Sequence, residues 1–394
     1  MAEPDESDAS ELVPAELTSW LRERRAFTVL DVRDRDAFET WHVSGPSVEA
    51  VQRPHQKFIA ARVTETTAEL APAGPEPVLV VCAVGEASAE VAEQLRGAGV
   101  DAWNLAGGMA AWARHYEAVE LLCSTATVLQ YHRPSTGCLS YLVVDEGNER
   151  RAAVIDPLRA FAERYAADAA AHDASLAYAV DTHVHADHVS GVRTVAAQTG
   201  AEPVYPRGIS SHEPSFEATP TLVQDGESLA LGHGTIALET VGLPGHTPDG
   251  VGFRLGDSEQ GDLLFCGDTL FLTTVARPDL AVESEAVDVM ARTLYASLAT
   301  LASMAPETRV APGHVSESTR PDDGGRYVAT LGDLRERLDL LGLDEAAFVE
   351  RVTGSLPPRP ANDAEIRRIN LGQQAADDET AFELELGPNN CAVE

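Results

Sequence analysis

The chain has 394 residues, long enough for two domains with cores of their own, and carries 63 Asp and Glu against 29 Lys and Arg, a formal net charge of -34 at pH 7. So negative a chain argues against nucleic acid as a partner. Lys57 is the only lysine, and an acidic composition almost without lysine is typical of halophilic proteins, in which salt screens the hydrated carboxylates.

The first ten residues are acidic and polar, whereas a signal peptide needs a basic and then an apolar run. No apolar run approaches the roughly 18 residues that a transmembrane helix requires. Cys82, Cys123, Cys138, Cys266 and Cys391 are an odd number without a close pair, which argues against a disulfide framework. We therefore expect a cytoplasmic chain with no membrane contact.

Residues 1–117 predict a first domain in which strands alternate with helices, the pattern of a doubly wound parallel sheet in an α/β fold. The expected strands are 27–32, 78–81 and 102–105, and the expected helices are 14–24, 34–40, 54–70 and 88–96.

Cys82 lies at the carboxyl end of the expected strand 78–81, on a short loop before a helix. Loop amides and a helix N-terminus could face its sulfur and stabilise an anion there, which would make Cys82 a catalytic nucleophile. A buried structural cysteine is the alternative.

This domain resembles a rhodanese domain, in which the cysteine carries a sulfane sulfur as a persulfide. The resemblance rests on Asp31-Val32-Arg33, on Phe38, His42 and Gly45, on the loop from Cys82 to Ser88, and on Asn104 to Trp112. Rhodaneses that process thiosulfate commonly carry an arginine in the loop, where this chain has Glu86 and Ala87, and a carboxylate there repels an anionic donor. We expect Cys82 to accept or relay sulfur with weak thiosulfate activity; a structural or interaction module is the alternative.

Residues 118–394 predict one large second domain. Strands are expected at 121–130, at 139–144 and 152–156 as a hairpin, at 176–180, at 203–205, within 222–241 with breaks at Asp225-Gly226 and His233-Gly234, and at 309–310. Helices are expected at 161–171, 189–200, 282–304, 331–352 and 362–372.

The loop between the expected strand 176–180 and the helix that follows it places His183, His185, Asp187 and His188 within six positions. Strand alternation places His183 and His185 on the same side, and the turn into the helix swings the other two round. We therefore expect all four to line one cavity, as a divalent metal requires.

Three further candidates each follow a β element, where the ligand loops of α/β proteins converge: His246 in a Pro-Gly-His turn, Asp268 after an apolar strand, and His314 in a second Pro-Gly-His turn. The order His-x-His-x-Asp-His, then His, Asp and His, resembles that of the metallo-β-lactamase superfamily. The resemblance implies an αβ/βα sandwich of two mixed sheets flanked by helices, with the metal at one edge.

This ligand set fits two chemistries. A glyoxalase II-type thioester hydrolase holds two metals with the residue at Asp268 bridging them, and a persulfide dioxygenase holds one ferrous ion on two histidines and one aspartate. Spacing alone does not exclude a second metal on Asp187, His188 and His314.

Neighbouring sequence resembles the persulfide dioxygenases, particularly those fused to rhodanese domains. The stretches are Gly137 to Leu142, Asp181 to His188, Gly267 to Phe271, Ala276 to Leu280, Leu356-Pro357-Pro358 and Gly387 to Cys391. The resemblance implies one Fe(2+) per chain on His183, His246 and Asp268. It leaves His185, Asp187, His188 and His314 as supporting groups or as ligands of Zn(2+) or another second metal, and it implies that Arg277 holds the carboxylate of the thiol carrier.

The expected reaction converts a low-molecular-weight thiol persulfide and O2 to sulfite and free thiol, and fusion to a persulfide carrier raises the local concentration of the shared sulfur. The alternatives are a dinuclear thioester hydrolase and a non-catalytic sulfur-binding or sensor protein. A homo-oligomer is compatible with the sequence.

Overall fold

The computed structural model describes residues 10–232, 236–354 and 356–393, and the chain forms two compact units. One unit contains residues 1–116 and 133–136, and the other contains residues 117–132 and 137–394. Residues 1–9 of the expected acidic tail and the expected break at His233-Gly234 lie outside the described residues.

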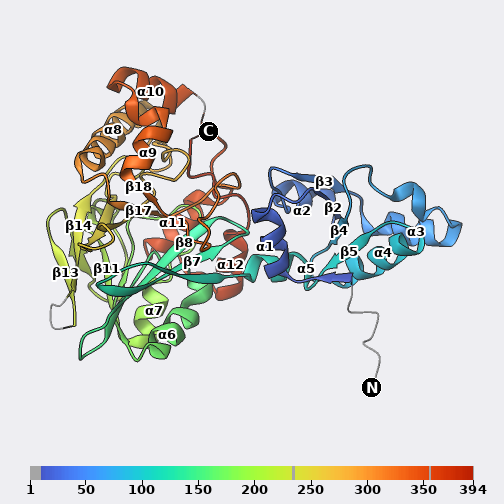
Figure 1. The fold of residues 1–394 in the computed structure, drawn as a ribbon, viewed down its shortest axis with the longest axis horizontal. Helices are drawn as coiled ribbons and strands as arrows, with labels where there is room; N and C mark the ends of the chain where they lie inside the picture. The colour runs from blue at the N-terminus through green and yellow to red at the C-terminus, as the bar shows by residue number, and fades with distance from the viewer. Residues whose placement is uncertain (1–9, 233–235, 355, 394) are drawn as a thin grey trace. The chain divides into compact units, whose positions relative to one another are not determined.

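The first unit is built on a five-stranded sheet in the order β1-β5-β4-β2-β3, and each of its strand pairs is parallel (Figure 1). Strands β2 and β4 are buried along their whole length, as their apolar sequences require. The elements are β1 (Glu11–Leu12), α1 (Pro14–Arg22), β2 (Phe27–Asp31), α2 (Arg35–Thr40), β3 (Val48–Gln52), α3 (His55–Thr64), β4 (Val78–Val81), α4 (Glu86–Gly97), β5 (Ala102–Leu105) and α5 (Gly108–Arg114). The expected parallel α/β sheet is confirmed.

The second unit contains two sheets, and the first has seven strands in the order β12-β11-β10-β9-β8-β7-β6. Its hairpin partners β8 and β9 are antiparallel, whereas β9 to β12 are parallel. Helices α6 and α7 pack on β10. The elements are β6 (Glu117–Leu121), β7 (Ala126–Arg133), β8 (Cys138–Asp145), β9 (Arg151–Ile155), α6 (Ala162–Ala171), β10 (Ser175–Val180), α7 (Val192–Thr199), β11 (Glu202–Pro206) and β12 (Thr221–Val223).

The other sheet has six strands in the order β13-β14-β15-β16-β17-β18, and one apolar core joins it to the first sheet. The two mixed sheets with their helices confirm the expected sandwich. The elements are β13 (Ser228–Leu231), β14 (Ile236–Gly242), β15 (Val251–Leu255), β16 (Leu263–Gly267), α8 (Val287–Ser303), β17 (Arg309–Pro312), β18 (Ala329–Thr330), α9 (Leu331–Arg337), α10 (Glu345–Gly354), α11 (Asp363–Asn370) and α12 (Asp378–Leu384).

The start of β8 in one sheet is bonded to the loop after β17 in the other. Leu139 N donates to Gly313 O at 2.8 Å, Val315 N donates to Gly137 O at 2.9 Å, and Cys138 forms a β-bridge with His314. Gly137 has φ +78°, and a Cβ there would lie 2.2 Å from Val315 O, so only glycine fits. This contact brings Cys138 to the end of the sandwich where the candidate ligands gather.

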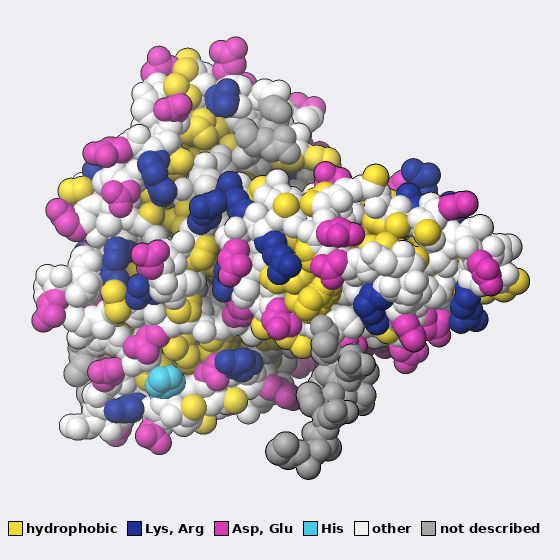
Figure 2. Space-filling view, turned by 45° about the vertical axis from the view of Figure 1, so that its right-hand side comes forward, with side chains coloured by type: hydrophobic (Ala, Val, Ile, Leu, Met, Phe, Trp, Pro, Cys, Tyr) yellow, Lys and Arg dark blue, Asp and Glu magenta, His cyan; other side chains and the backbone are white. Residues whose placement is uncertain are grey.

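Acidic side chains are spread over the face in view rather than gathered in one patch (Figure 2). Among the described residues, every helix is too short or too polar to cross a membrane.

Candidate metal centre

The loop between β10 and α7 carries four candidate ligands, and all four side chains are buried. The other candidates come from loops of the second sheet: His246 lies between β14 and β15, Asp268 directly follows β16, and His314 follows β17. The candidates of the two sheets therefore meet at the same end of the sandwich.

His183, His246 and Asp268 form a group whose ligand atoms all lie within 4.8 Å of one another. Asp268 Oδ2 lies 4.0 Å from His183 Nε2 and 3.8 Å from His246 Nε2. His183 Nε2 and Asp268 Oδ2 are buried and have no hydrogen-bond partner among the described residues. A divalent cation between them would satisfy both atoms, so the donor set fits a metal.

The other ring nitrogen of each histidine is fixed by a hydrogen bond. His246 Nδ1 donates to Arg277 O at 2.8 Å, because a carbonyl oxygen can only accept. His183 Nδ1 lies 2.9 Å from Thr182 Oγ1, whose hydrogen goes to Asp156 Oδ2 at 2.9 Å, so the threonine oxygen accepts from the ring. Both histidines therefore keep a lone pair on Nε2, the tautomer that binds a metal.

Electrostatics favour the ligand forms of all three residues. Burial lowers the pKa of His183, which His185 lowers further, and burial also lowers the pKa of His246. Burial raises the pKa of Asp268, but the nearby His314 outweighs it and holds this pKa below its usual value. Two neutral imidazoles and one carboxylate suit a divalent metal ion.

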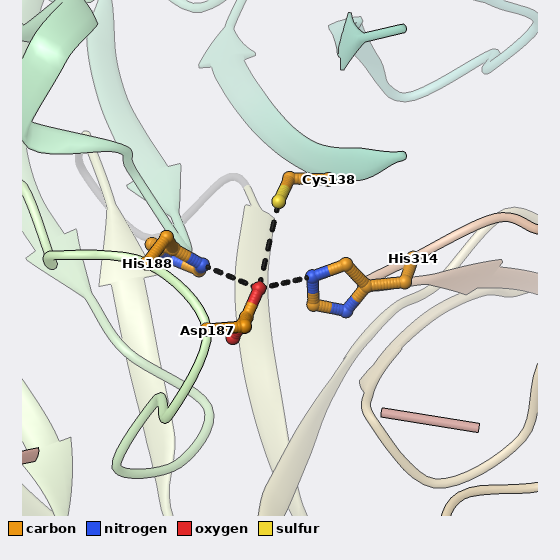
Figure 3. Close-up of side chains that lie close together, drawn as sticks. All are labelled: Cys138, Asp187, His188 and His314. Atoms are coloured by element: carbon orange, nitrogen blue, oxygen red, sulfur yellow. Dashed lines mark hydrogen bonds and ion pairs between the residues drawn. The ribbon is translucent and has the colours of Figure 1, made fainter. Parts of the chain in front are cut away.

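A second group consists of Cys138, Asp187, His188 and His314, whose ligand atoms also lie within 4.8 Å of one another. Three of these side chains point to one oxygen, Asp187 Oδ2 (Figure 3). It lies 2.7 Å from His314 Nε2 and 3.2 Å from His188 Nδ1. Cys138 Sγ donates to the same oxygen at 3.5 Å.

His314 lies between two carboxylates, since its Nδ1 is also 2.6 Å from Asp268 Oδ1. Carboxylates only accept, so both ring nitrogens donate and the ring is an imidazolium. Burial lowers the pKa of His314, but Asp268 and Asp187 outweigh it and hold this pKa well above its usual value. Burial and His185 lower the pKa of His188, yet Asp187 raises it to about 9. The raised pKa values of His188 and His314 favour their protonated forms beside the two carboxylates.

His185 belongs to a third group. Its Nε2 lies 3.2 Å from Asp156 Oδ1 and 3.6 Å from Asp181 Oδ1. Its ring is close to those of His183 and His188, with centroid distances of 4.2 and 4.0 Å. The loop therefore brings its three histidines together as expected, and their ligand atoms belong to three different groups.

Arg277 differs from the expectation for a substrate-binding residue. It is 1 % exposed, and its Nε and Nη2 donate to the two oxygens of Asp279 at 2.7 and 2.9 Å. Its Nη1 donates to Pro358 O and Asn390 O. Four of its five N–H groups are thus bonded within the protein, which leaves no fork for a ligand carboxylate. Arg277 instead holds the loop whose carbonyl orients His246.

In the first unit, Cys82 is buried at the end of β4, in the loop before α4. Gly85 N and Ser88 Oγ each donate to Cys82 Sγ at 3.1 Å. Glu86 is exposed. The hydrogen-bond donors to the Cys82 sulfur are therefore one loop amide and one hydroxyl.

Family models match both units: one described as "Metallo-beta-lactamase superfamily" matches residues 134–314, and one described as "Rhodanese-like domain" matches residues 13–115. A "Beta-lactamase hydrolase-like protein" of Xylella fastidiosa is 30% identical over 254 residues, which are 57% of this chain and 55% of that protein, so the chain spans about half of that relative. "Persulfide dioxygenase ETHE1, mitochondrial" of Bos taurus is 30% identical over 232 residues, covering 59% of this chain and 82% of that protein. The chain belongs to the metallo-beta-lactamase superfamily.

The superfamily fold extends to solved structures. The crystal structure of ETHE1 from Myxococcus xanthus matches with a TM-score of 0.50 and 26% identity over 61% of this chain and 98% of that chain. This superfamily member thus combines a metallo-beta-lactamase domain with a rhodanese-like domain.

Two buried cysteines, Cys138 and Cys391, border the site. Cys138 joins the second group, and the Sγ of Cys391 lies within 4.8 Å of ligand atoms of Asp268 and His314. Arg277 N donates to Cys391 O at 3.0 Å, which fixes the tail beside the site. Both cysteines lie in stretches that carry the family resemblance, and that was the signal that could have found them.

Proposed function

We propose that this chain is a non-haem Fe(2+) persulfide dioxygenase. The reaction is RSSH + O2 + H2O giving RSH and sulfite with two protons, where RSH is a low-molecular-weight thiol. One relative, 82% of which is covered by the match, is named a persulfide dioxygenase. The rhodanese-like domain also fits a substrate that contains sulfane sulfur.

The observation that carries the proposal is the division of the candidate ligands. His183 Nε2 and Asp268 Oδ2 have no hydrogen-bond partner among the described residues, and neither do Asp187 Oδ1 and His188 Nε2, whereas His314 donates from both nitrogens. The charges of Asp187 and Asp268 are balanced by imidazolium groups, a role that a second metal ion would otherwise serve. The proposal takes this division as support for one metal on a His-His-Asp face.

The protein groups prepare the site. When bound, ferrous iron supplies open positions for O2 and for the persulfide sulfur, and redox chemistry that zinc lacks. Arg277 O and Thr182 Oγ1 hold the two histidines in the binding tautomer. The His314 cation, between Asp187 and Asp268, offsets negative charge where an anionic persulfide would arrive.

Oxygen uptake measured with an electrode, together with metal analysis, tests the proposal. Uptake should require both persulfide and ferrous iron, with one iron per chain, and His183→Ala should abolish it. His172→Ala serves as the control, because this half-buried histidine at the end of α6 lies outside the three groups. Full activity of His183→Ala would contradict the ligand assignment.

A dinuclear thioester hydrolase is the second candidate, and the proximity of Cys138, Asp187, His188 and His314 favours it. Two metals per chain with thioester cleavage and no oxygen uptake would establish it in place of the dioxygenase. A sulfur-binding sensor would show neither reaction.

Cys82 is proposed to carry sulfur to or from the metal domain as a persulfide, stabilised by the Gly85 and Ser88 donors. Cys82→Ala should keep oxygen uptake with soluble persulfide but lose sulfur transfer to an added thiol. Cys123→Ala, a half-buried cysteine in the other unit, is the control. Unchanged sulfur transfer in Cys82→Ala would refute the relay.

A further inference from the structure

Helix α8 packs directly against the turn that carries the candidate ligand His246. This turn consists of residues 244–247 and lies between β14 and β15. Gly245 has φ +142°, and a Cβ there would lie 2.4 Å from Leu294 Cα on α8. Because Gly245 has no side chain, the turn can touch the backbone of the helix.

A buried serine of α8 bonds to the same turn. Ser297 is 4 % exposed, and its Oγ donates to Pro244 O at 2.5 Å. That carbonyl lies two residues before His246, whose Nδ1 donates to Arg277 O at 2.8 Å. The turn is thus bonded to α8 through Ser297 and to the Arg277 loop through the ligand itself.

The hydroxyl of Ser297 differs from the other Ser and Thr hydroxyls of α8. Within a helix, such hydroxyls commonly bond back to a carbonyl of the same helix. Thr293, Thr300 and Ser303 each donate to a carbonyl three or four positions earlier in α8. Ser297 instead donates to a carbonyl 53 positions away in the chain.

Helix stability alone favours alanine at position 297. Alanine has a higher helix propensity than serine and buries no polar group. The buried face of α8 is otherwise apolar, with Ala291, Leu294, Leu298 and Leu301 in the core. The contact with the turn therefore explains the hydroxyl, and the helix does not.

We propose that Ser297 is a positioning residue for the metal, whose hydroxyl fixes the 244–247 turn and thereby the ring of His246. The proposal rests on the assignment of His246 as a ligand, which belongs to the proposed function. His246 Nε2 lies 3.8 Å from Asp268 Oδ2, a separation that one ion can bridge. A turn released from α8 leaves this ring less fixed, so the metal meets a less organised set of donors.

Titration of the metal-free full chain with Co(2+) alone tests the proposal. Cobalt binds imidazole and carboxylate without turnover, and its visible absorption bands depend on the geometry of its ligands. Ser297→Ala should weaken cobalt binding about 2- to 10-fold, the factor that corresponds to one net hydrogen bond, and should change the absorption bands. Ser297→Thr keeps the hydroxyl and should restore both.

The matched control is Ser124→Ala, which removes a serine hydroxyl at the other end of β15. Ser124 Oγ donates to Asp257 Oδ1 at 2.6 Å, and Asp257 follows β15, whereas His246 precedes it. This variant should keep the cobalt affinity and the absorption bands of wild type, whatever stability it loses in urea unfolding. Equal weakening of cobalt binding in Ser124→Ala and Ser297→Ala would indicate a loss of stability alone and would overturn the proposal.

His246→Ala separates this proposal from the ligand assignment. Unchanged cobalt affinity in His246→Ala would refute the assignment, and the proposed function with it. Weaker binding in His246→Ala, together with wild-type affinity and absorption bands in Ser297→Ala, would refute only the positioning role. Equal losses in Ser297→Thr and Ser297→Ala would also refute that role, because the hydroxyl would then not be the cause.

Discussion

Replacing Thr182 with valine removes one hydroxyl that links the metal loop to a buried carboxylate. This hydroxyl accepts from His183 Nδ1 at 2.9 Å and donates to Asp156 Oδ2 at 2.9 Å, and Thr182 is 1 % exposed. Valine has nearly the same shape, so the packing is kept. Each of the two buried groups left unpaired should cost about 1–3 kcal/mol of folding stability.

The functional effect of Thr182→Val should exceed a loss of stability alone. Without its acceptor, His183 is no longer held with its lone pair on Nε2, and loss of such an orienting partner typically lowers metal affinity about 10- to 100-fold. A ferrous-iron titration gives the affinity, and urea unfolding gives the stability. Thr182→Ser keeps the hydroxyl and should restore most of the affinity. Equal affinities in wild type and Thr182→Val would refute the orienting role.

Three other perturbations follow from the structure. Gly137→Ala should lower the unfolding temperature more than Gly226→Ala. Alanine costs about 1–2 kcal/mol at both positions because both have left-handed backbone, but only the Cβ added at position 137 would clash with Val315 O. Equal decreases in unfolding temperature would contradict this. Burial raises the pKa of Asp257, but hydrogen bonds from Ser124 outweigh it and hold this pKa below its usual value. Its carboxylate therefore contributes stability that is lost as the pH falls below about 3.9. In urea unfolding, the free energy of unfolding of Asp257→Asn should fall less steeply with decreasing pH than that of wild type. The same slope in both proteins would contradict this. Removing the metal with a chelator should abolish oxygen uptake and lower the unfolding temperature. Added Fe(2+) should restore both, and added Zn(2+) should restore only the unfolding temperature. Oxygen uptake by the zinc-loaded protein would contradict the redox role of the metal.

The fold was predictable where local patterns decide it, as in β4, β5 and the β8–β9 hairpin. The expected strand 121–130 was wrong: β6 ends at Leu121 and β7 begins at Ala126. Between them, Ser124 bonds to Asp257, which is 133 positions away, so no local signal marks this break. β3 and β15 were not expected; β3 is only half-buried, so its sequence lacks an apolar run.

The candidate site was predictable as a set of residues but not as an arrangement. Motif spacing identified His183, His246 and Asp268 as candidate ligands. Spacing alone could not separate His185 from them, because its ring nitrogen faces Asp156 and Asp181, which tertiary packing buries beside it. Only the resemblance to the persulfide dioxygenases set His185 apart. The internal bonding of Arg277 also depends on distant backbone carbonyls, at Pro358 and Asn390.

The proposed metal ligands come from both sheets: His183 follows a strand of the seven-stranded sheet, and Asp268 follows a strand of the six-stranded sheet. An ion held by both would cross-link the two sheets. Its binding free energy would therefore add to the folding free energy of the whole domain. The supply of that metal would then set the lifetime of the protein. Where the metal is scarce, the metal-free chain would open more often and be degraded sooner.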